Sequence, residues 1–176
     1  MGPESVTTPS ARILIVDDEE RIAELVTWFL RRSGHEAVHV RSFEEARQVL
    51  ASLAPHLLLS DIELGAENAR EELPRLSAEG KLPPTLIVSG FLDSIIVEEL
   101  HALPEVRGML AKPFDFATLE ERICELIKQL ESEGVTFRGS MANTIATPQP
   151  ATTGDAGVAE DDEDEGWIEI LPMSSF

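Results

Sequence analysis

Three carboxylates, a hydroxyl and an ammonium follow short apolar runs of this chain and together suit phosphoryl chemistry around a divalent cation. The residues are Asp17, Asp18, Asp61, Ser89 and Lys112. An aspartate can attack phosphorus and become an acyl phosphate, and carboxylate oxygens are ligands for Mg²⁺. A lysine and a serine then supply counter-charge and a hydrogen bond to the transferred oxygens. A single Asp after a strand is usually a turn or N-cap residue, so the inference rests on the whole set.

Short apolar runs alternate with amphipathic stretches from residue 12 to about 132, which predicts a doubly wound α/β domain. The predicted strands form a five-stranded parallel sheet and cover residues 13–16, 36–40, 56–60, 85–89 and 106–110. The five predicted helices cover about 19–32, a stretch from 43 onward, 67–79, 93–102 and 116–130. Ligands bind at the carboxyl ends of such strands, so the five polar residues are expected in one pocket.

Local signals mark the ends of several predicted helices. Ser42 with Glu45 three residues later forms a capping-box pair for the second helix. Gly34 is the expected C-terminal glycine of the first helix. Pro74 falls inside the third helical pattern, where it either begins a short helix or kinks a longer one.

Composition narrows the class of protein. With 176 residues, 43% of them hydrophobic, the chain can bury one core of ordinary domain size and have an extension left over. Its net charge of −19 argues against nucleic-acid binding, which depends on Lys and Arg, and against an anionic membrane surface. The single cysteine, Cys124, forms no internal disulfide and is expected to pack as a half-buried thiol. With neither a secretory signal nor a long apolar stretch, the expected location is cytoplasmic.

The polar residues lie in motifs that resemble the receiver domain of two-component response regulators, the CheY-like domain. The motifs are Ile-Leu-Ile-Val-Asp17-Asp18, Ser60-Asp61, Ile-Val-Ser89-Gly90 and Lys112-Pro113-Phe114. The resemblance implies a flavodoxin-like strand order 2-1-3-4-5 and a cis Lys112–Pro113 bond.

The resemblance also assigns roles to individual residues. It makes Asp61 the phosphoacceptor and gives Mg²⁺ to Asp17, Asp18, Asp61 and the backbone carbonyl of Glu63. Ser89 and Lys112 would hold the phosphoryl group. The donor in this family is a phosphohistidine of a sensor histidine kinase or a phosphotransfer protein. The only catalysis implied is the domain's own phosphorylation and dephosphorylation.

Three positions depart from the family pattern. Met109 occupies the place of the usual aromatic switch residue that works with Ser89, and a flexible thioether lacks a defined rotamer there. Glu63 and Phe91 occupy the places that flank the attacking water, so they are expected to alter dephosphorylation. The loop after Asp61 lacks the usual proline.

The composition changes after the predicted domain. We predict a disordered segment at 1–10, the receiver domain at 11–133, a flexible Pro/Thr/Ala linker at 134–159 and an acidic tail at 160–176. The tail is either a solvated acidic segment or a docking peptide for a basic groove of another protein. The body's own acidity disfavours docking in cis. The docking residues would be Trp167, Ile168, Ile170 and Leu171.

Two functions fit these patterns. The first is a phosphorylatable regulator that signals through protein contacts without a DNA-binding output domain, in part through Ile95, Ile96 and Val97 of the fourth helix. The second is an adaptor with a receiver fold that binds partners irrespective of phosphorylation, as Met109 suggests. An Asp-nucleophile phosphatase fits poorly, because it would carry Asp-x-Asp on the first strand, where this chain has Asp17-Asp18.

Overall fold

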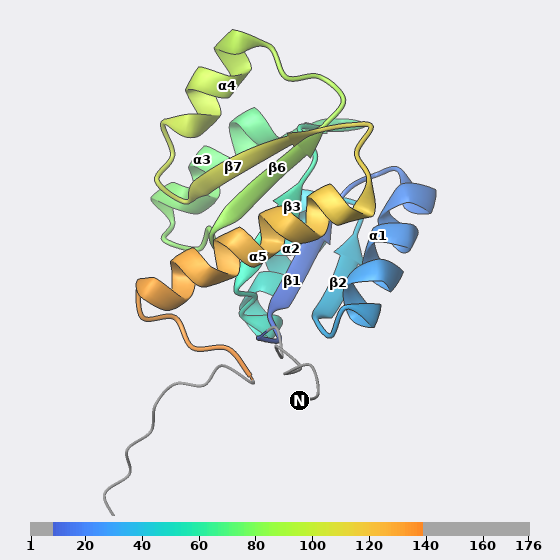
Figure 1. Ribbon diagram of the computed structural model, residues 1–176. Coiled ribbons are helices and arrows are strands. Elements are labelled where there is room, and N and C mark those ends of the chain that lie inside the picture. The colour runs from blue at the N-terminus through green and yellow to red at the C-terminus, as the bar shows by residue number, and fades with distance from the viewer. Residues whose placement is uncertain (1–8, 139–176) are drawn as a thin grey trace, which may run out of the picture. The chain divides into compact units, whose positions relative to one another are not determined.

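The computed structural model describes residues 9–138, which contain one five-stranded sheet with all neighbouring strands parallel (Figure 1). The strand order is β2-β1-β3-β6-β7, which confirms the predicted 2-1-3-4-5 topology. Each run of β-branched and leucine residues lies where the sequence predicted a strand, to within one residue. The bounds are β1 Arg12–Val16, β2 Glu36–Val40, β3 Leu57–Ser60, β6 Thr85–Ser89 and β7 Val106–Ala111.

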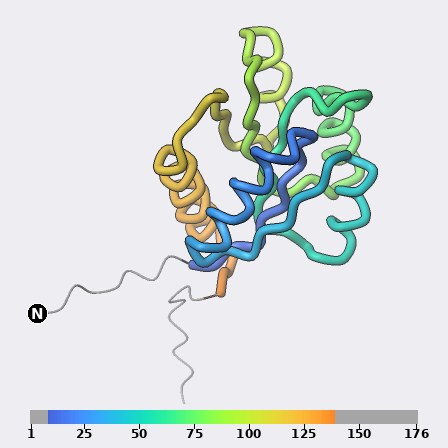
Figure 2. The backbone as a smooth tube through the Cα atoms, turned by 90° about the vertical axis from the view of Figure 1, so that its right-hand side faces the viewer, coloured from blue at the N-terminus to red at the C-terminus, as the bar shows by residue number. Residues whose placement is uncertain are grey.

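Five helices in the described residues cover the sheet on both faces, and the view in Figure 2 separates α5 from α2 and α3. One apolar core lies between the sheet and helices α1 and α5, and a second lies between the sheet and α2, α3 and α4. The central strands β1 and β3 contribute to both cores, which is why they read as continuous apolar runs. The bounds are α1 Glu20–Arg32, α2 Phe43–Leu53, α3 Ala69–Ala78, α4 Ser94–His101 and α5 Phe116–Ser132.

Caps and glycines end the helices largely as predicted. The Ser42 side chain accepts a hydrogen bond from the Glu45 N–H at the start of α2. Gly34 has φ of +95° just after α1, a conformation that suits glycine. Helix α3 begins at Ala69 and runs through Pro74, so this proline does not start the helix. Burial of Leu73 and Leu76 on either side offsets the backbone hydrogen bond that proline cannot donate.

A small antiparallel hairpin between β3 and α3 was not predicted. Strands β4, Glu63–Leu64, and β5, Glu67–Asn68, pair with each other and form a separate two-stranded sheet. Two residues per strand are too few for a recognisable alternation of polar and apolar side chains. The third helix therefore begins two residues later than the predicted 67.

The two ends of the described chain pair with each other at the amino edge of the sheet. Ser10 forms an antiparallel bridge with Arg138, and its N–H donates to the Arg138 carbonyl at 2.7 Å. Phe137 is only 6% exposed and packs with the core under α1 and α5. Residues 134–138, which we expected to begin the linker, thus pack against the domain. The rest of the expected linker, the acidic tail and residues 1–8 lie outside the described residues.

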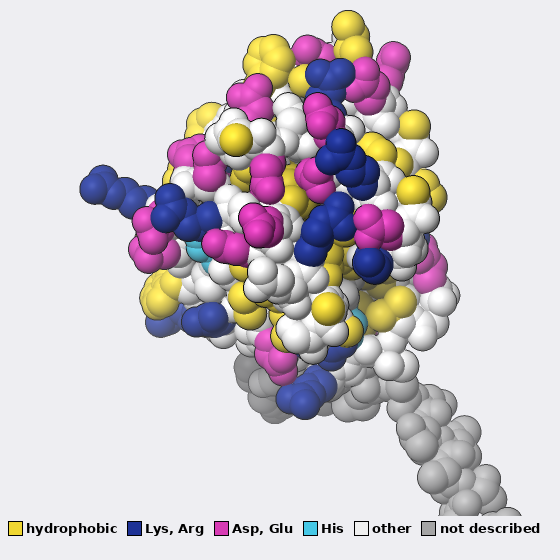
Figure 3. Space-filling view, turned by 180° about the vertical axis from the view of Figure 1, so that it is seen from behind, with side chains coloured by type: hydrophobic (Ala, Val, Ile, Leu, Met, Phe, Trp, Pro, Cys, Tyr) yellow, Lys and Arg dark blue, Asp and Glu magenta, His cyan; other side chains and the backbone are white. Residues whose placement is uncertain are grey.

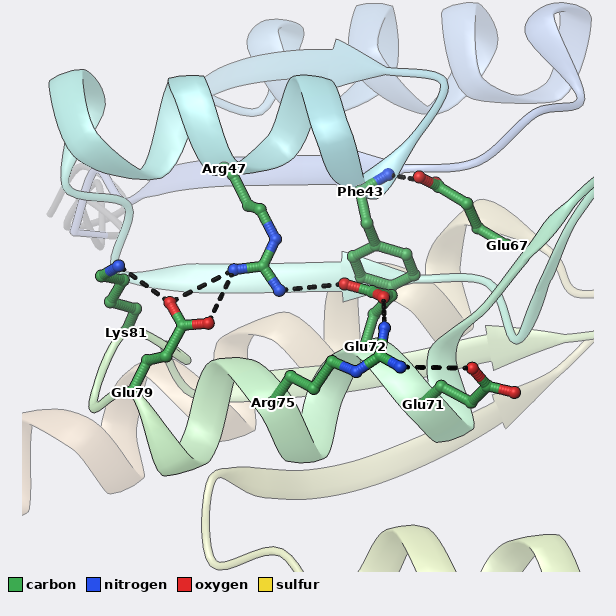
Figure 4. A network of polar contacts seen from close by, with 8 residues as sticks. All are labelled: Phe43, Arg47, Glu67, Glu71, Glu72, Arg75, Glu79 and Lys81. Atoms are coloured by element: carbon green, nitrogen blue, oxygen red, sulfur yellow. Dashed lines mark hydrogen bonds and ion pairs between the residues drawn. The ribbon is translucent and has the colours of Figure 1, made fainter.

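The helices α2 and α3 are joined by ion pairs (Figure 4). Arg47 of α2 contacts Glu72 at 2.9 Å and Glu79 at 3.1 Å. Arg75 also contacts Glu72, and Lys81 contacts Glu79 at 2.8 Å. Figure 3 shows acidic and basic side chains interspersed on this side of the molecule, so no single charge dominates it.

Among residues 9–138, no helix has the length and apolar character needed to cross a bilayer.

Candidate functional site

The predicted polar residues meet at the carboxyl edge of the sheet. Asp17 follows β1, Asp61 follows β3, Ser89 ends β6 and Lys112 follows β7. Two backbone hydrogen bonds extend the ladder past the strands: the Asp61 N–H donates to the Val16 carbonyl, and the Lys112 N–H donates to the Ser89 carbonyl, each at 2.9 Å. The site residues are therefore positioned by the rigid sheet.

The Lys112 ammonium is the centre of this arrangement. Its Nζ donates to Asp17 Oδ2 at 2.7 Å and to Asp61 Oδ2 at 2.8 Å, and lies 3.4 Å from Glu19 Oε1. Burial alone lowers the pKa of this lysine, but the hydrogen bonds to Asp17 and Asp61 outweigh it and raise the pKa above its usual range. Lys112 therefore carries its charge throughout the physiological range.

Each of the two buried carboxylates is held by one backbone donor as well as by Lys112. Asp61 Oδ1 accepts from the Ile62 N–H at 2.5 Å, and Asp17 Oδ1 accepts from the Glu19 N–H at 2.8 Å. The side chains of Asp17 and Asp61 are 8% and 9% exposed. Their orientation is thus fixed, with one oxygen of each carboxylate directed at the same ammonium.

Oxygen atoms of three acidic side chains come close enough to share a cation. One carboxylate oxygen from each of Asp17, Glu19 and Asp61 lies within 4.8 Å of the others. Such hard oxygen donors, few in number, suit Mg²⁺ with water completing its shell. The structure places the exposed Asp18 on the wall of the same pocket, but not in this group of three.

The prediction did not include the Glu19 side chain. Its only signal in the sequence is its place directly after Asp17-Asp18.

The hairpin β4–β5 forms one wall of the pocket, which has a volume of about 720 Å³. Glu63, Gly65 and Glu67 line this pocket together with Asp18 and Asp61. Gly65, at the hairpin turn, has φ of +58°, and a Cβ atom placed on it would lie 3.8 Å from Asp18 Oδ2. The hairpin therefore extends from the Asp61 side of the pocket to the Asp18 side.

Ser89 and Met109 lie in different surroundings. Ser89 is buried on the pocket wall, where its Oγ accepts from the Phe91 N–H at 3.4 Å. Met109 is half-buried on β7 and lines a different hollow of about 330 Å³, between β7 and helices α4 and α5. The structure brings Ser89 to the pocket that Asp18 and Asp61 line and does not bring Met109 there. The Lys112–Pro113 bond is cis, as the resemblance implied.

Residues 13–124 match the model of the response regulator receiver domain. The chain belongs to the response regulator receiver family. The match covers the sheet and helices α1 to α4, together with the first half of α5. It also includes every predicted phosphoryl-site residue.

Curated relatives of the receiver domain include regulators of gene expression. The alkaline phosphatase synthesis transcriptional regulatory protein PhoP of Bacillus subtilis is 27% identical over 123 residues, which are 68% of this chain and 50% of PhoP. A protein-glutamate methylesterase/protein-glutamine glutaminase of Bacillus licheniformis is 37% identical over 81 residues, 44% of this chain and 22% of that protein. The chain thus spans half or less of the length of these two relatives.

Solved receiver structures share the fold. A CheY-like receiver domain protein from Methanospirillum hungatei superposes with a TM-score of 0.66 at 24% identity, covering 71% of this chain and 99% of that one. The signal receiver domain of a putative Luxo repressor protein from Vibrio parahaemolyticus gives a TM-score of 0.66 at 18% identity, covering 71% and 95%.

Proposed function

We propose that this receiver domain accepts a phosphoryl group on Asp61 from the phosphohistidine of a sensor histidine kinase or phosphotransfer protein. The observation that carries the proposal is the Lys112 ammonium, held 2.8 Å from Asp61 Oδ2. A cation fixed beside the attacking carboxylate is in place before the reaction to neutralise charge on the phosphoryl oxygens. Ser89 lines the same pocket and offers a hydroxyl to those oxygens.

The transfer exchanges one bond for another. An oxygen of the Asp61 carboxylate forms a bond to phosphorus while the phosphorus–nitrogen bond of the donor breaks, and its electron pair stays on the imidazole of the donor. In the slower deactivation, which is hydrolysis, a water oxygen forms a bond to phosphorus, the water gives up a proton and the bond from phosphorus to Asp61 breaks. This releases inorganic phosphate and restores the carboxylate. Glu63 and Phe91 line the pocket that this water has to enter.

Mg²⁺ fits the acidic side of this pocket. Asp17, Asp18, Asp61 and the backbone carbonyl of Glu63 would hold the ion, with Glu19 also within reach. When bound, Mg²⁺ offsets negative charge on the phosphoryl group. The carboxylates repel one another and the incoming phosphate, so this chain needs more positive charge than Lys112 alone supplies.

The segment after Ser89 supports our proposal that the domain signals through protein contacts. The Phe91 N–H donates to Ser89 Oγ, and the side chains of Phe91 and Ile95 are 58% and 63% exposed. If the Ser89 hydroxyl turns towards a phosphoryl group on Asp61, it loses the hydrogen bond that it accepts from the Phe91 N–H. The exposed apolar residues of this segment then change position, and a downstream protein reads that change.

The adaptor function remains the second candidate. Met109 is half-buried and lines a hollow away from the phosphoryl pocket. A flexible side chain at this place fills space without adopting one of two defined orientations. Binding of partners would then be insensitive to phosphorylation.

Phosphorylation with a small-molecule donor separates the two candidates. Full-length protein is incubated with phosphoramidate and Mg²⁺, and intact mass spectrometry measures the added phosphoryl group. The switch requires an adduct on the wild type that is lost in Asp61→Asn. An unmodified wild type at saturating Mg²⁺ contradicts the switch and favours the adaptor.

The acidic-tail docking residues Trp167, Ile168, Ile170 and Leu171 lie outside the described residues. We propose that they bind a partner protein with a basic groove. A pull-down with the peptide 160–176 tests this, with a Trp167→Ala peptide as the control. Equal retention by the two peptides contradicts a role for the tryptophan.

A further inference from the structure

The side chain of Glu67 ties the hairpin wall of the pocket to a distant helix. Its Oε2 accepts a hydrogen bond of 2.6 Å from the Phe43 N–H, 24 residues away in the chain (Figure 4). Phe43 is the first residue of α2 and is fully buried. A carboxylate at a helix N-terminus is stabilised both by the free N–H group and by the positive end of the helix dipole. The tether is therefore a charge-assisted hydrogen bond to an immobile group.

The hairpin has little else to hold its outer part in place. Its two strands are two residues long each, too short for a hairpin to be stable alone. At its base, the hairpin's own Leu64 is buried in the core, and the Ala69 N–H donates to the Ile62 carbonyl. The turn residues Gly65 and Ala66 are exposed. Among the polar contacts of residues 63–68 in the described chain, the one from Glu67 to Phe43 is the long-range contact to another element.

The position of the hairpin matters for the pocket because the same few residues line it. Glu63 pairs with Asn68, and Leu64 pairs with Glu67, so a shift of Glu67 moves both strands. Gly65 sits close to Asp18, and Glu63 is two residues from Asp61. A hairpin that rocks outward would carry the Glu63 backbone away from the carboxylates.

We propose that Glu67 is a positioning residue that fixes the hairpin wall and thereby preorganises the pocket for Mg²⁺. The inference rests on the proposed function in one respect only, the use of that ion at Asp61. Glu67 itself donates no ligand in this scheme, since its Oε2 is engaged at α2 and the carboxylates close enough to share a cation are those of Asp17, Glu19 and Asp61.

A competing explanation is purely electrostatic. Glu67 adds negative charge to an acidic pocket, and any substitution that removes this charge weakens cation binding. Glu67→Gln separates the two explanations, because its amide oxygen still accepts from the Phe43 N–H while the charge is gone. Glu67→Ala removes both the charge and the acceptor.

A matched control for helix stability lies on the same helix end. Glu45 Oε2 accepts from the Arg41 N–H at 3.1 Å near the start of α2, but it does not contact the hairpin. Glu45→Ala therefore removes a comparable capping carboxylate without releasing the pocket wall.

Two measurements on the full chain test the proposal without any phosphodonor. Calorimetric titration with MgCl₂ gives the dissociation constant for the ion, and hydrogen exchange followed by mass spectrometry reports opening of residues 62–68. We expect Glu67→Ala to raise the dissociation constant roughly tenfold, the scale of one lost charged hydrogen bond. Exchange in 62–68 should accelerate, while Glu67→Gln stays within about threefold of the wild type in both measurements.

Three results would overturn the proposal: wild-type values for Glu67→Ala, equal weakening by Glu67→Gln and Glu67→Ala, or the same effect from Glu45→Ala. The second of these would assign the effect to charge alone. Absence of a phosphoryl adduct on the wild type would contradict the proposed function instead, and the titration and exchange data would still decide the role of Glu67.

Discussion

Lys112 donates to Asp61 across 2.8 Å, although 51 residues separate them in the chain. The same ammonium also contacts Asp17 at 2.7 Å, so one cation serves two buried carboxylates. The site around Lys112 therefore has an excess of negative charge even with its lysine in place.

Replacement of Lys112 by Met should destabilise the domain and make it more responsive to Mg²⁺. Asp17 and Asp61 would be left buried without a cation, at a cost of about 3–5 kcal/mol in the free energy of unfolding. Urea unfolding with and without MgCl₂ measures both effects. The ion should stabilise Lys112→Met more than the wild type. Asp61→Asn serves as the control. It should change the free energy of unfolding by less than about 1 kcal/mol, because Lys112 still donates its hydrogen bond to Asp17.

Acidification should lower the stability of the domain through two histidines at the amino edge of the sheet. His35 Nδ1 accepts from the Ala11 N–H, and His56 Nδ1 accepts from the Arg12 N–H, so both rings must be neutral there. Burial lowers the pKa of His35 against the opposing influence of Glu120, and burial and Arg12 lower the pKa of His56 against Glu36.

The sign of the effect follows from proton uptake. A histidine with a lowered pKa is protonated more readily in the unfolded chain, so stability falls as the pH drops below about 6.5. Urea midpoints at pH 7.5 and 5.5 should differ less in the double variant His35→Gln/His56→Gln than in the wild type. An equal pH dependence of the two proteins would exclude these histidines as its source.

Phe137→Ala should destabilise the domain by about 3–5 kcal/mol, because the ring is buried and its loss leaves a cavity. The ring also stacks edge-to-face on His56, with centroids 4.7 Å apart. Arg138→Ala is the matched control: its side chain is 83% exposed in the ion pair with Glu36, so we expect a change below about 0.5 kcal/mol. Guanidinium unfolding of the full chain checks both values, and a similar small effect from both variants would argue against a packed segment at 135–138.

Ala54→Gly should stabilise the protein by roughly 0.5–1 kcal/mol. Ala54 ends α2 with φ of +45°, in the left-handed region that disfavours a Cβ atom. Its carbonyl accepts hydrogen bonds from the Arg12 side chain, which hold this conformation in place. Thermal unfolding measures the gain, and a lower melting temperature would mean that chain entropy outweighs the relief of strain.

The sheet and the main site residues were predictable because both follow from strong, repeated signals. Apolar runs of four or five residues mark buried strands, and the polar residue after each run must lie at the carboxyl edge. The hairpin at Glu63–Asn68 gave no such signal. Its geometry depends on Gly65 and on the hydrogen bond that Glu67 accepts from the Phe43 N–H of α2.

Phe137 was missed for a different reason. The residues after α5 have no periodicity, and a lone aromatic among them gives no hint that a site 81 residues away, at His56, completes its packing. Glu19 gives no separate signal in the sequence, because it directly follows the two acidic residues Asp17 and Asp18. In each case the contact that fixes the residue is distant in the chain or depends on a single side chain.

The bridge between Ser10 and Arg138 has a practical consequence for experiments on this protein. Both ends of the described chain leave the domain at the start of β1, whereas Asp17 follows the end of that strand. The five-residue strand β1 separates these chain ends from Asp17 by about 17 Å. Fluorescent reporters or affinity handles attached beside either residue would therefore start at the pole remote from Asp61 and leave the approach of a phosphodonor unobstructed.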